Sequence, residues 1–383
     1  MNTKLVHAGE HKEQPLGKPV ATPIYTASTY TYPSMKELNA VMEGTGGDYV
    51  YVRYGNPTIA ALEDAVATAE NGKFAVAFGS GMAAIHASLM ACSLVPGDSV
   101  IASQDLYGAS LHLLNNIFKP LGIGAETEDF ADLDKLRSAV HGKKPKVLLA
   151  ETISNPMLKV CDISSVAEVA HSVGAKLIVD STFASPYLCR PLEFGADISV
   201  HSATKYLGGH GDAIGGVAVT SDESIHASLV SIKKLVGGMM SVWEAHEILR
   251  GIKTLGLRVE RQCQNAAALA ERLRGNEKVS AVYYPGQHRV LRDPFGGALV
   301  SIRLKDDTQE AAFRFMDALQ LVVRATSLGD VYTLVSHSAS SSHRELSPKR
   351  RAELGITEGL VRISVGIEDV DDIIFDIEHA LNG

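Results

Sequence analysis

Residues 197–210 read Asp197-Ile-Ser-Val-His201-Ser-Ala-Thr-Lys205-Tyr-Leu-Gly-Gly-His210. The apolar start of this stretch is typical of a short buried strand, and a single lysine follows among small hydroxyl residues, just before two glycines. An amine that must be uncharged for part of a reaction requires a tight, partly desolvated pocket with hydroxyl groups that orient it. We therefore predict that Lys205 forms a Schiff base. The alternative is an ordinary solvated lysine, which is the commoner case for an isolated motif of this kind.

The chain on either side of this stretch alternates between helices and short apolar strands. Helices are expected at residues 58–70, 80–93, 163–173 and 370–381, with further helical character from 244 to 274. Strands are expected at residues 73–78, 99–103, 146–151, 176–180, 197–201, 215–219 and 360–365. Such alternation predicts an α/β fold with a mostly parallel sheet covered on both faces. Ligands bind beyond the carboxyl ends of such strands, where Lys205 is expected.

Composition and charge limit the class of protein. The chain has 383 residues, enough for two domains, and its 45% hydrophobic and 21% charged residues are ordinary for a globular enzyme. A formal net charge of −8 without a basic stripe argues against nucleic acid and anionic membranes as partners. Four scattered cysteines are typical of buried thiols in a reducing compartment. Because there is no signal-peptide pattern and no apolar run of membrane-spanning length, we expect a cytoplasmic protein.

A glycine-containing turn, Phe78-Gly-Ser80-Gly81-Met82, connects an expected strand to an expected helix. Ser80 is a good N-cap, and Gly81 allows a ligand to approach the backbone closely. The free N–H groups of the first helical turn favour an anion, for which phosphate is the natural candidate. The alternative is a simple strand-to-helix turn, since such turns often contain glycine.

Three further polar side chains are expected at the ends of strands. Asp180 ends its strand, while Asn155 and Tyr107 follow two others. The Asp180 carboxylate could pair with the protonated ring nitrogen of a pyridine cofactor, and Tyr107 could stack on that ring and transfer protons. Taken singly, each is more often structural. Because the carboxyl ends of parallel strands meet at one edge of a sheet, we predict that these side chains share a crevice with Lys205.

Other site chemistries lack their motifs. The sequence contains no G-x-x-x-x-G-K-[ST] and no G-x-S-x-G, and Gly209-His-Gly211 lacks the third glycine of the dinucleotide fingerprint. The pair His246-Glu247 lacks the second histidine of a zinc-binding helix, so we predict no metal site.

Motifs along nearly the whole chain carry a family resemblance. They are Tyr51-Val-Arg53-Tyr-Gly-Asn-Pro-Thr58, Ser80-Gly-Met-Ala-Ala84, Asp105-Leu-Tyr107-Gly108, Glu151-Thr-Ile-Ser-Asn155-Pro156, Val179-Asp-Ser-Thr-Phe-Ala184, His201-Ser-Ala-Thr-Lys205-Tyr206 and Leu360-Val-Arg362-Ile-Ser-Val-Gly-Ile-Glu-Asp369. In this order they resemble the Cys/Met-metabolism family of pyridoxal-phosphate enzymes, which includes cystathionine γ-synthase, cystathionine γ-lyase, methionine γ-lyase and O-acetylhomoserine sulfhydrylase. The resemblance implies the aspartate aminotransferase-like fold, fold type I, and pyridoxal 5'-phosphate as cofactor.

The resemblance also implies roles for individual residues. Lys205 would carry the cofactor and shuttle protons, Asp180 would pair with the ring nitrogen, and Tyr107 would stack on the ring and act as an acid. The implied phosphate ligands are Gly81, Met82, Ser202 and Thr204, joined by Tyr51 and Arg53 from a neighbouring subunit. The substrate α-carboxylate, a planar anion suited to a guanidinium, would be held by Arg362 with Ser327 and Asn155, the last of which would also contact the cofactor.

The domain organisation follows from the sequence pattern together with the same resemblance. Residues 1–56 have weak periodicity and many turn formers, and would form an arm that reaches the neighbouring subunit. Residues 57–245 would form the cofactor-binding domain, and residues 246–383 a smaller α+β domain. Family members are usually homotetramers built from two dimers with shared active sites.

The implied reaction is a γ-elimination on a sulfur-containing or homoserine-derived amino acid, giving a 2-oxo acid, ammonia and a thiol. The alternative is γ-replacement, in which a thiol captures the intermediate. Several positions depart from the subfamily patterns: His112 stands where cystathionine-handling members usually have arginine, Ala109 where methionine γ-lyases usually have cysteine, and Thr326 where cystathionine γ-lyases often have glutamate. Residues 286–297 form a short segment, and residues 336–343 replace the usual His-Pro-Ala-x-x-Thr-His. His112, Ala109 and Thr326 are expected to decide which group leaves.

Overall fold

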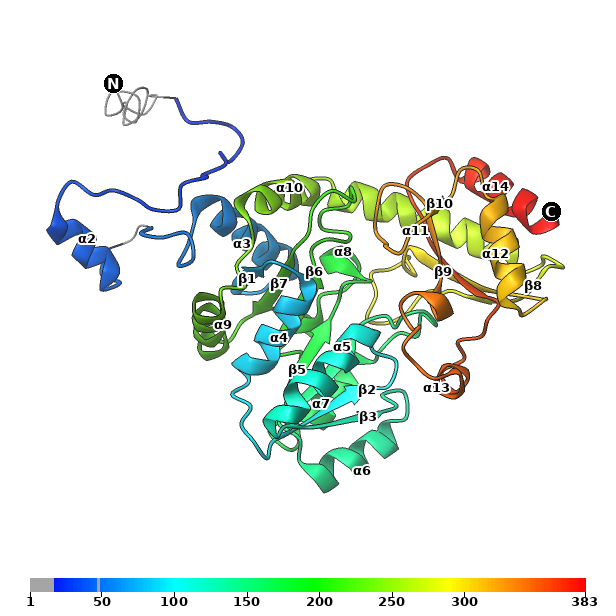
Figure 1. Cartoon of the computed structure of the whole chain (residues 1–383), viewed down its shortest axis with the longest axis horizontal. Helices are drawn as coiled ribbons and strands as arrows, with labels where there is room; N and C mark the ends of the chain where they lie inside the picture. Colours follow the sequence, from blue (N-terminus) through cyan, green and yellow to red (C-terminus); the bar gives the residue numbers. More distant parts are fainter. Residues whose placement is uncertain (1–16, 47–48) are drawn as a thin grey trace.

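Two β-sheets organise the computed structural model, which describes residues 17–46 and 49–383 (Figure 1). The strands of the larger sheet are β1 (Phe74–Phe78), β2 (Ser99–Ser103), β3 (Gly124–Glu128), β4 (Val147–Glu151), β5 (Lys176–Asp180), β6 (Ile198–Ser202) and β7 (Gly216–Thr220). Their order is β1-β7-β6-β5-β4-β2-β3. Strands β2 to β6 pair in parallel, while β7 runs antiparallel to β6 and β1. The mostly parallel sheet predicted from the sequence is confirmed.

Helices cover both faces of the larger sheet. One face packs against α3 (Pro57–Glu70), α6 (Leu133–Lys143), α7 (Ile163–His171) and α10 (Val242–Ile252). The other packs against α4 (Gly81–Ala91), α9 (Glu223–Val236) and α5 (Gly108–Leu113) with its continuation η1 (Leu114–Phe118). Shorter helical turns are η2 (Lys119–Leu121), α8 (Ser185–Leu188) and η3 (Pro191–Phe194). The near-continuous apolar strands are therefore buried on both sides, as a parallel sheet requires.

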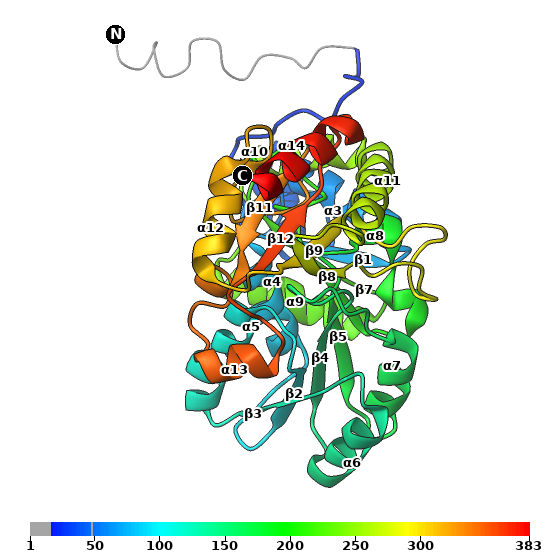
Figure 2. The same ribbon diagram turned by 90° about the vertical axis from the view of Figure 1, so that its right-hand side faces the viewer.

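The smaller sheet lies beside the larger one and carries its own helices (Figure 2). Its strands are β8 (Val279–Tyr283), β9 (Leu299–Leu304), β10 (Val323–Arg324), β11 (Leu334–His337) and β12 (Leu360–Ser364), in the order β10-β11-β12-β9-β8. Its apolar face packs against α11 (Leu255–Leu273), α12 (Gln309–Ala318) and α14 (Val370–Asn382). The helical turn η4 (Ser338–Ser340) and the helix α13 (Pro348–Glu353) lie between β11 and β12.

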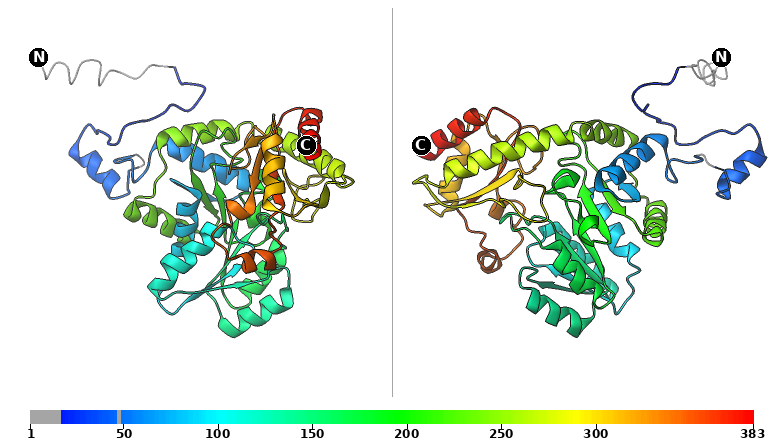
Figure 3. Two further views of the ribbon diagram at one scale, coloured as in Figure 1. Left: turned by 45° about the vertical axis from the view of Figure 1, so that its right-hand side comes forward. Right: turned by 180° about the vertical axis from the view of Figure 1, so that it is seen from behind.

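The N-terminal stretch does not join either sheet. Its helix α2 (Met35–Met42) buries none of its residues, and the preceding described segment is largely exposed. Figures 1 and 3 show this stretch projecting away from the body of the chain. Residues 1–16 and 47–48 of the expected arm lie outside the described residues.

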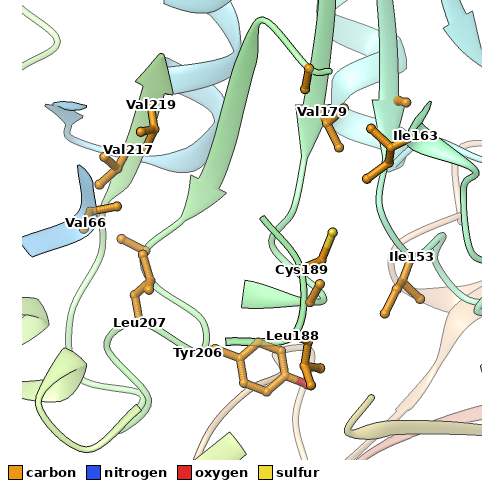
Figure 4. Packing of buried hydrophobic residues seen from close by; sticks show 14 of the residues in the cluster. Val66, Ile153, Ile163, Val179, Leu188, Cys189, Tyr206, Leu207, Val217 and Val219 are labelled. Carbon is orange, nitrogen blue, oxygen red and sulfur yellow. The ribbon is translucent and has the colours of Figure 1, made fainter. Parts of the chain in front are cut away.

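The residue after Lys205 anchors the loop that carries the lysine. Tyr206 is fully buried and packs near Leu188 and Leu207 in the core beneath the larger sheet (Figure 4). Gly329, from the segment before β11, approaches so closely that an added Cβ would lie 2.8 Å from the Tyr206 backbone nitrogen. Packing on both sides of this tyrosine therefore limits the positions that the Lys205 backbone can adopt.

Several elements around the larger sheet have no counterpart among the segments expected from the sequence, and two helices were expected as one stretch. They include the helices α5, α6 and α9 and the strand β3. Strand β3 lies at the edge of the sheet, has mostly exposed side chains and lacks the apolar run of its neighbours. The helical stretch expected from residue 244 to 274 is divided at Lys253 and Thr254 into α10 and α11.

No helix in the described ranges combines the length and apolar character needed to cross a membrane.

Candidate active site

A cavity of about 570 Å³ lies at the carboxyl ends of the larger sheet's strands and reaches the smaller sheet. The structure brings together most of the site residues predicted from the sequence on its walls. These are Gly81, Met82, Tyr107, Asn155, Asp180, Ser202, Thr204, Lys205 and Arg362, with Thr326 at the same cavity. Ser327 contacts two of them through hydrogen bonds.

The Lys205 amine points to the junction between the two sheets. Its Nζ donates a hydrogen bond to Ser327 Oγ at 2.8 Å. Burial lowers the pKa of this lysine from its usual value, and the nearby Arg362 guanidinium lowers it further, against the opposing effect of Asp330. The uncharged amine is the nucleophilic form, so these surroundings favour the reactive state of Lys205.

Asp180 lies at the end of β5, and one of its carboxylate oxygens accepts hydrogen bonds from Thr182. Its Oδ1 accepts a hydrogen bond from the Thr182 backbone N–H at 3.0 Å and another from the Thr182 hydroxyl. Burial raises the pKa of this carboxyl group above its usual value, against the effect of the Thr182 hydrogen bonds. A cationic group facing Oδ2 from the cavity would favour the ionised form, so a protonated pyridine nitrogen fits this position.

The first turn of α4 forms a compact anion site. Ser80 caps the helix by accepting a hydrogen bond from the Ala83 N–H at 3.1 Å, and burial of α4 against the sheet fixes its direction. A Cβ on Gly81 would lie only 2.8 Å from Ser202 Cβ, so a larger residue would close the space between the helix and β6. Free N–H groups of a first helical turn, with the hydroxyl groups of Ser202 and Thr204 on the same cavity, fit a phosphate.

Arg362 lies on β12 and provides a site for a carboxylate. Its Nη1 donates to Asn155 Oδ1 at 2.9 Å and its Nη2 to the Ser327 carbonyl at 3.0 Å. Its buried Nε finds no acceptor among the described residues. Burial lowers the pKa of Arg362 to about 10, which still leaves it a cation at neutral pH. A buried guanidinium with an unused donor in a cavity is suited to an anionic ligand.

Glu151, at the end of β4, is a site residue that the sequence did not single out. Its Oε1 accepts a hydrogen bond from the Tyr107 N–H at 2.7 Å, and its buried Oε2 has no partner in the described part of the chain. Burial, together with the neighbouring Asp180 carboxylate, raises the pKa of Glu151 well above its usual value. This carboxyl group therefore fixes the backbone at Tyr107, whose side chain lines the cavity and is 40% exposed.

Tyr51 and Arg53 do not line the cavity of their own chain. Arg53 Nη1 donates to the Lys234 carbonyl at 2.7 Å, and its guanidinium lies over the Tyr51 and Tyr54 rings, 5.4 and 5.0 Å from their centroids. Within one chain, therefore, neither residue contributes to the cavity that contains Lys205. Their binding of the phosphate in a neighbouring subunit stays a prediction.

The positions that depart from the subfamily patterns do not all lie at the cavity. Thr326 lines the cavity, whereas Ala109 and residues 286–297 do not. His112 does not line the cavity either, and it forms an ion pair with Glu345, with 2.9 Å between Nε2 and Oε2.

One wall of the cavity comes from residues that sequence reasoning did not place there. It consists of Ser336, Ser340, Ser341, Ser342 and Arg344, joined by Phe183 from beyond β5. Residues 336–343 had been noted only as a departure from the family pattern. Among the described residues, no group of three or more His, Cys, Asp or Glu side chains is arranged to hold a metal ion.

Comparisons with known proteins agree with this geometry. The Cys/Met metabolism PLP-dependent enzyme family matches residues 2–382. An L-methionine γ-lyase of Pseudomonas putida is 40% identical over 99% of this chain and 96% of its own, and a cystathionine β-lyase of Coxiella burnetii is 41% identical over 100% and 97%. The solved structure of a cystathionine γ-synthase from Xanthomonas oryzae pv. oryzae, with aminoacrylate and cysteine, has a TM-score of 0.89 at 37% identity, over 95% of this chain and 93% of that one. The chain belongs to the Cys/Met metabolism family of PLP-dependent enzymes.

Proposed function

We propose that this enzyme catalyses γ-elimination on a sulfur-containing or homoserine-derived amino acid, releasing a 2-oxo acid, ammonia and the γ-substituent, which is a thiol when the substrate contains sulfur. The observation that carries the proposal is the position of Lys205 Nζ, which donates to the Ser327 hydroxyl, while Arg362 donates to the carbonyl of the same serine. An α-carboxylate held at Arg362 would bring the substrate Cα close to the amine that removes its proton.

The cofactor supplies an electron sink for the negative charge that develops at the substrate Cα when the proton leaves. Gly81, Met82, Ser202 and Thr204 are proposed to hold its phosphate, and Asp180 its ring nitrogen. The fit of these groups rests on the free first turn of α4 and on the Asp180 oxygen left open by Thr182.

Lys205 and Tyr107 would then move the protons. Lys205, whose pKa is lowered by burial, is suited to accept the Cα proton. Once it has passed that proton on to the conjugated system that takes up the charge, it would be a free amine again and could accept the Cβ proton. Tyr107, fixed by Glu151 at the cavity, is suited to protonate the departing thiolate. Arg362 and Asn155 would keep the α-carboxylate in place through both transfers.

We further propose the assembly in which this site works. Residues 1–56 would form an arm to the neighbouring subunit, residues 57–245 the cofactor-binding domain, and residues 246–383 the C-terminal domain. Tyr51 and Arg53 would complete the phosphate site of the neighbour, in a homotetramer made of two dimers and located in the cytoplasm. The supporting observation is that the described arm projects from the chain and buries little of its own surface.

Two related reactions have specific support. The Xanthomonas structure belongs to a γ-synthase, which supports γ-replacement as a second candidate. The Coxiella relative is named a cystathionine β-lyase, which supports cleavage on the other side of the sulfur. All three reactions would use the same cofactor site, so the products must distinguish them.

The test is product analysis with purified holoenzyme. L-Methionine, L-cystathionine and O-acetyl-L-homoserine are incubated separately, with and without sulfide. γ-Elimination predicts 2-oxobutanoate and ammonia in equal amounts. Pyruvate with homocysteine from L-cystathionine would identify β-elimination, and homocysteine from O-acetyl-L-homoserine plus sulfide, without 2-oxobutanoate, would identify γ-replacement. Either result would refute the proposal.

A further inference from the structure

Arg344 is a second guanidinium at the cavity that the proposed mechanism does not use. It follows the serine-rich turn between β11 and α13, and its side chain is exposed and lines the cavity together with Ser340, Ser341 and Ser342. Across the described residues, Arg344 has no ion pair and its side chain makes no hydrogen bond. A cation without a protein partner on a ligand cavity is available to an anion.

The segment that carries Arg344 is held firmly against the site. The His337 ring bonds to Ser340 Oγ at 2.8 Å and to the Glu358 carbonyl at 2.7 Å. The Arg344 N–H donates to the Ser341 carbonyl at 3.3 Å, which closes the turn just before the side chain. The backbone of Arg344 is therefore positioned by local contacts.

This segment also lies beside the residue proposed to protonate the leaving group. A Cβ on Gly108 would come within 2.9 Å of the Ser342 carbonyl oxygen, so the turn packs directly on the residue after Tyr107. A substituent that departs past Tyr107 would thus meet the wall formed by Ser342 and Arg344. The distal end of the substrate and Arg344 would lie on the same side of the cavity.

The charges at the cavity leave Arg344 as the available cation for a distal group. Lys205 donates a hydrogen bond to Ser327 and is assigned to the cofactor in the proposed mechanism. Arg362 donates to Asn155 and is assigned to the α-carboxylate. The neighbouring carboxylate, Glu345, is paired with His112 instead. The two carboxyl groups on the wall, Glu151 and Asp180, lie at the strand ends and have pKa values raised by burial.

We propose that Arg344 is a specificity-determining residue that binds a second carboxylate, on the γ-substituent of the substrate. This inference rests on the proposed function, because it assumes an amino acid held at Arg362 with its γ-substituent directed past Tyr107. His112 is paired with Glu345 and does not line the cavity, whereas Arg344 does. The preferred substrates are thioethers with an acidic distal end, ahead of thioethers of equal length with a neutral end.

A matched pair of substrates tests the proposal. S-(2-Carboxyethyl)-L-homocysteine and S-propyl-L-homocysteine differ only in the distal carboxylate, and 2-oxo acid release gives kcat/KM for each. The wild-type enzyme is expected to prefer the acidic thioether, and Arg344→Gln to lower that preference about 10-fold, the scale of one charge-assisted hydrogen bond at a partly exposed position. Arg344→Lys should retain part of the preference, since the charge remains while the planar fork is lost.

Arg350→Gln is the control variant, since Arg350 lies on α13, pairs with Glu353 at 3.0 Å and does not line the cavity. It should leave the preference unchanged. A preference that is equal in the wild type and Arg344→Gln would overturn the proposal. If neither thioether is turned over, their equilibrium binding to the holoenzyme is measured through the change in cofactor absorbance, and the ratio of the two dissociation constants replaces the ratio of kcat/KM values. Failure of the proposed reaction is thereby distinguished from failure of the Arg344 assignment.

Discussion

Tyr107 illustrates what a single residue contributes to this site. Its backbone is fixed by Glu151 and its ring is free to face the cavity. The proposed role of this tyrosine as an acid can be separated from its proposed role as a ring that stacks on the cofactor. The two depend on different atoms of the side chain.

Replacing Tyr107 with phenylalanine removes the hydroxyl group and keeps the ring. We expect kcat to fall about 100-fold or more, the contribution of one positioned general acid. Cofactor content, measured by absorbance after dialysis, should stay at the wild-type level because the stacking surface is kept. Tyr332→Phe, an exposed tyrosine outside the cavity, is the control. If Tyr107→Phe retained wild-type kcat, another group would have to protonate the leaving thiolate.

The residues that sequence reasoning found and those it missed differ in their surroundings. Lys205 and Asn155 follow apolar strands and Asp180 ends one, so their place at one sheet edge could be predicted from the parallel pairing of those strands. Arg344 and the serines before it lie in a turn without periodicity, and they reach the cavity only because the smaller sheet lies against the larger one. No local pattern encodes that contact.

Among the elements, α4 is the one whose position relative to β6 is proposed to determine phosphate binding. Gly81→Ala would place a Cβ 2.8 Å from Ser202 Cβ and 3.0 Å from its Cα, which forces the helix away from β6. We expect the variant to lose cofactor on dialysis about 10-fold faster or more, because the first-turn N–H groups would no longer meet a phosphate held by Ser202.

Gly142→Ala is the matched control for that experiment. Gly142 lies on α6, and a Cβ there would meet no atom within 4 Å. This substitution should leave cofactor retention unchanged and stabilise the protein by about 0.5–1 kcal/mol, since alanine is the better helix former. Equal cofactor loss in both variants would show that the space at Gly81 is not what holds the phosphate.

The turn after β11 carries a buried histidine that makes stability depend on pH. Burial and the Arg362 charge lower the pKa of His343 to about 4, while the unfolded chain binds that proton near pH 6.5. The folded state therefore loses stability as the pH falls from about 6.5 to about 4, by about 3 kcal/mol in total. Above pH 6.5 this contribution is constant.

Thermal unfolding of the holoenzyme between pH 7 and pH 4.5 measures that effect. His343→Asn removes the titrating group, so its unfolding midpoint should fall less steeply with acid than that of the wild type. His141→Gln, at an exposed position on α6, should follow the wild-type curve. Parallel curves for His343→Asn and the wild type would contradict the assignment.

Element prediction from the sequence succeeded where apolar runs mark buried strands and failed at the periphery. Strand β3 has the sequence Gly-Ala-Glu-Thr-Glu and lies at the sheet edge, so the parallel partner β2 decides its structure. The break between α10 and α11 involves no proline. Gly251, near the end of α10, contacts the backbone of Gly208 so closely that a Cβ would lie 2.2 Å from its carbonyl oxygen. Such constraints arise from tertiary packing.

At the scale of the whole molecule, the arm raises the question of how many chains make one site. Arg53 lies outside the cavity of its own chain, and its role toward a neighbour is a proposal. Sequence patterns can indicate that an irregular segment reaches another chain, but they cannot say where it binds, because that depends on the geometry of the oligomer.

Subunit complementation tests this sharing. Arg53→Ala and Lys205→Ala should each be inactive or nearly so, because each lacks one part of every site. Mixed oligomers from co-expression should recover roughly a quarter of wild-type activity, because in a dimer with two-fold symmetry one of two sites regains both groups in half of the randomly paired dimers. No recovery on mixing, with mixed oligomers verified by mass spectrometry, would place Arg53 outside the neighbour's site.

Lys205 is proposed to hold the cofactor, and the other assignments at the site depend on this attachment. Borohydride reduction of the holoenzyme, followed by proteolysis and peptide mass spectrometry, locates the attachment directly and does not require a known substrate. We predict that the peptide containing Lys205 carries the reduced pyridoxyl phosphate and that Lys233, a buried lysine paired with Glu63 at 3.0 Å, does not. Label on Lys233 or on any other lysine, or none on Lys205, would contradict the account.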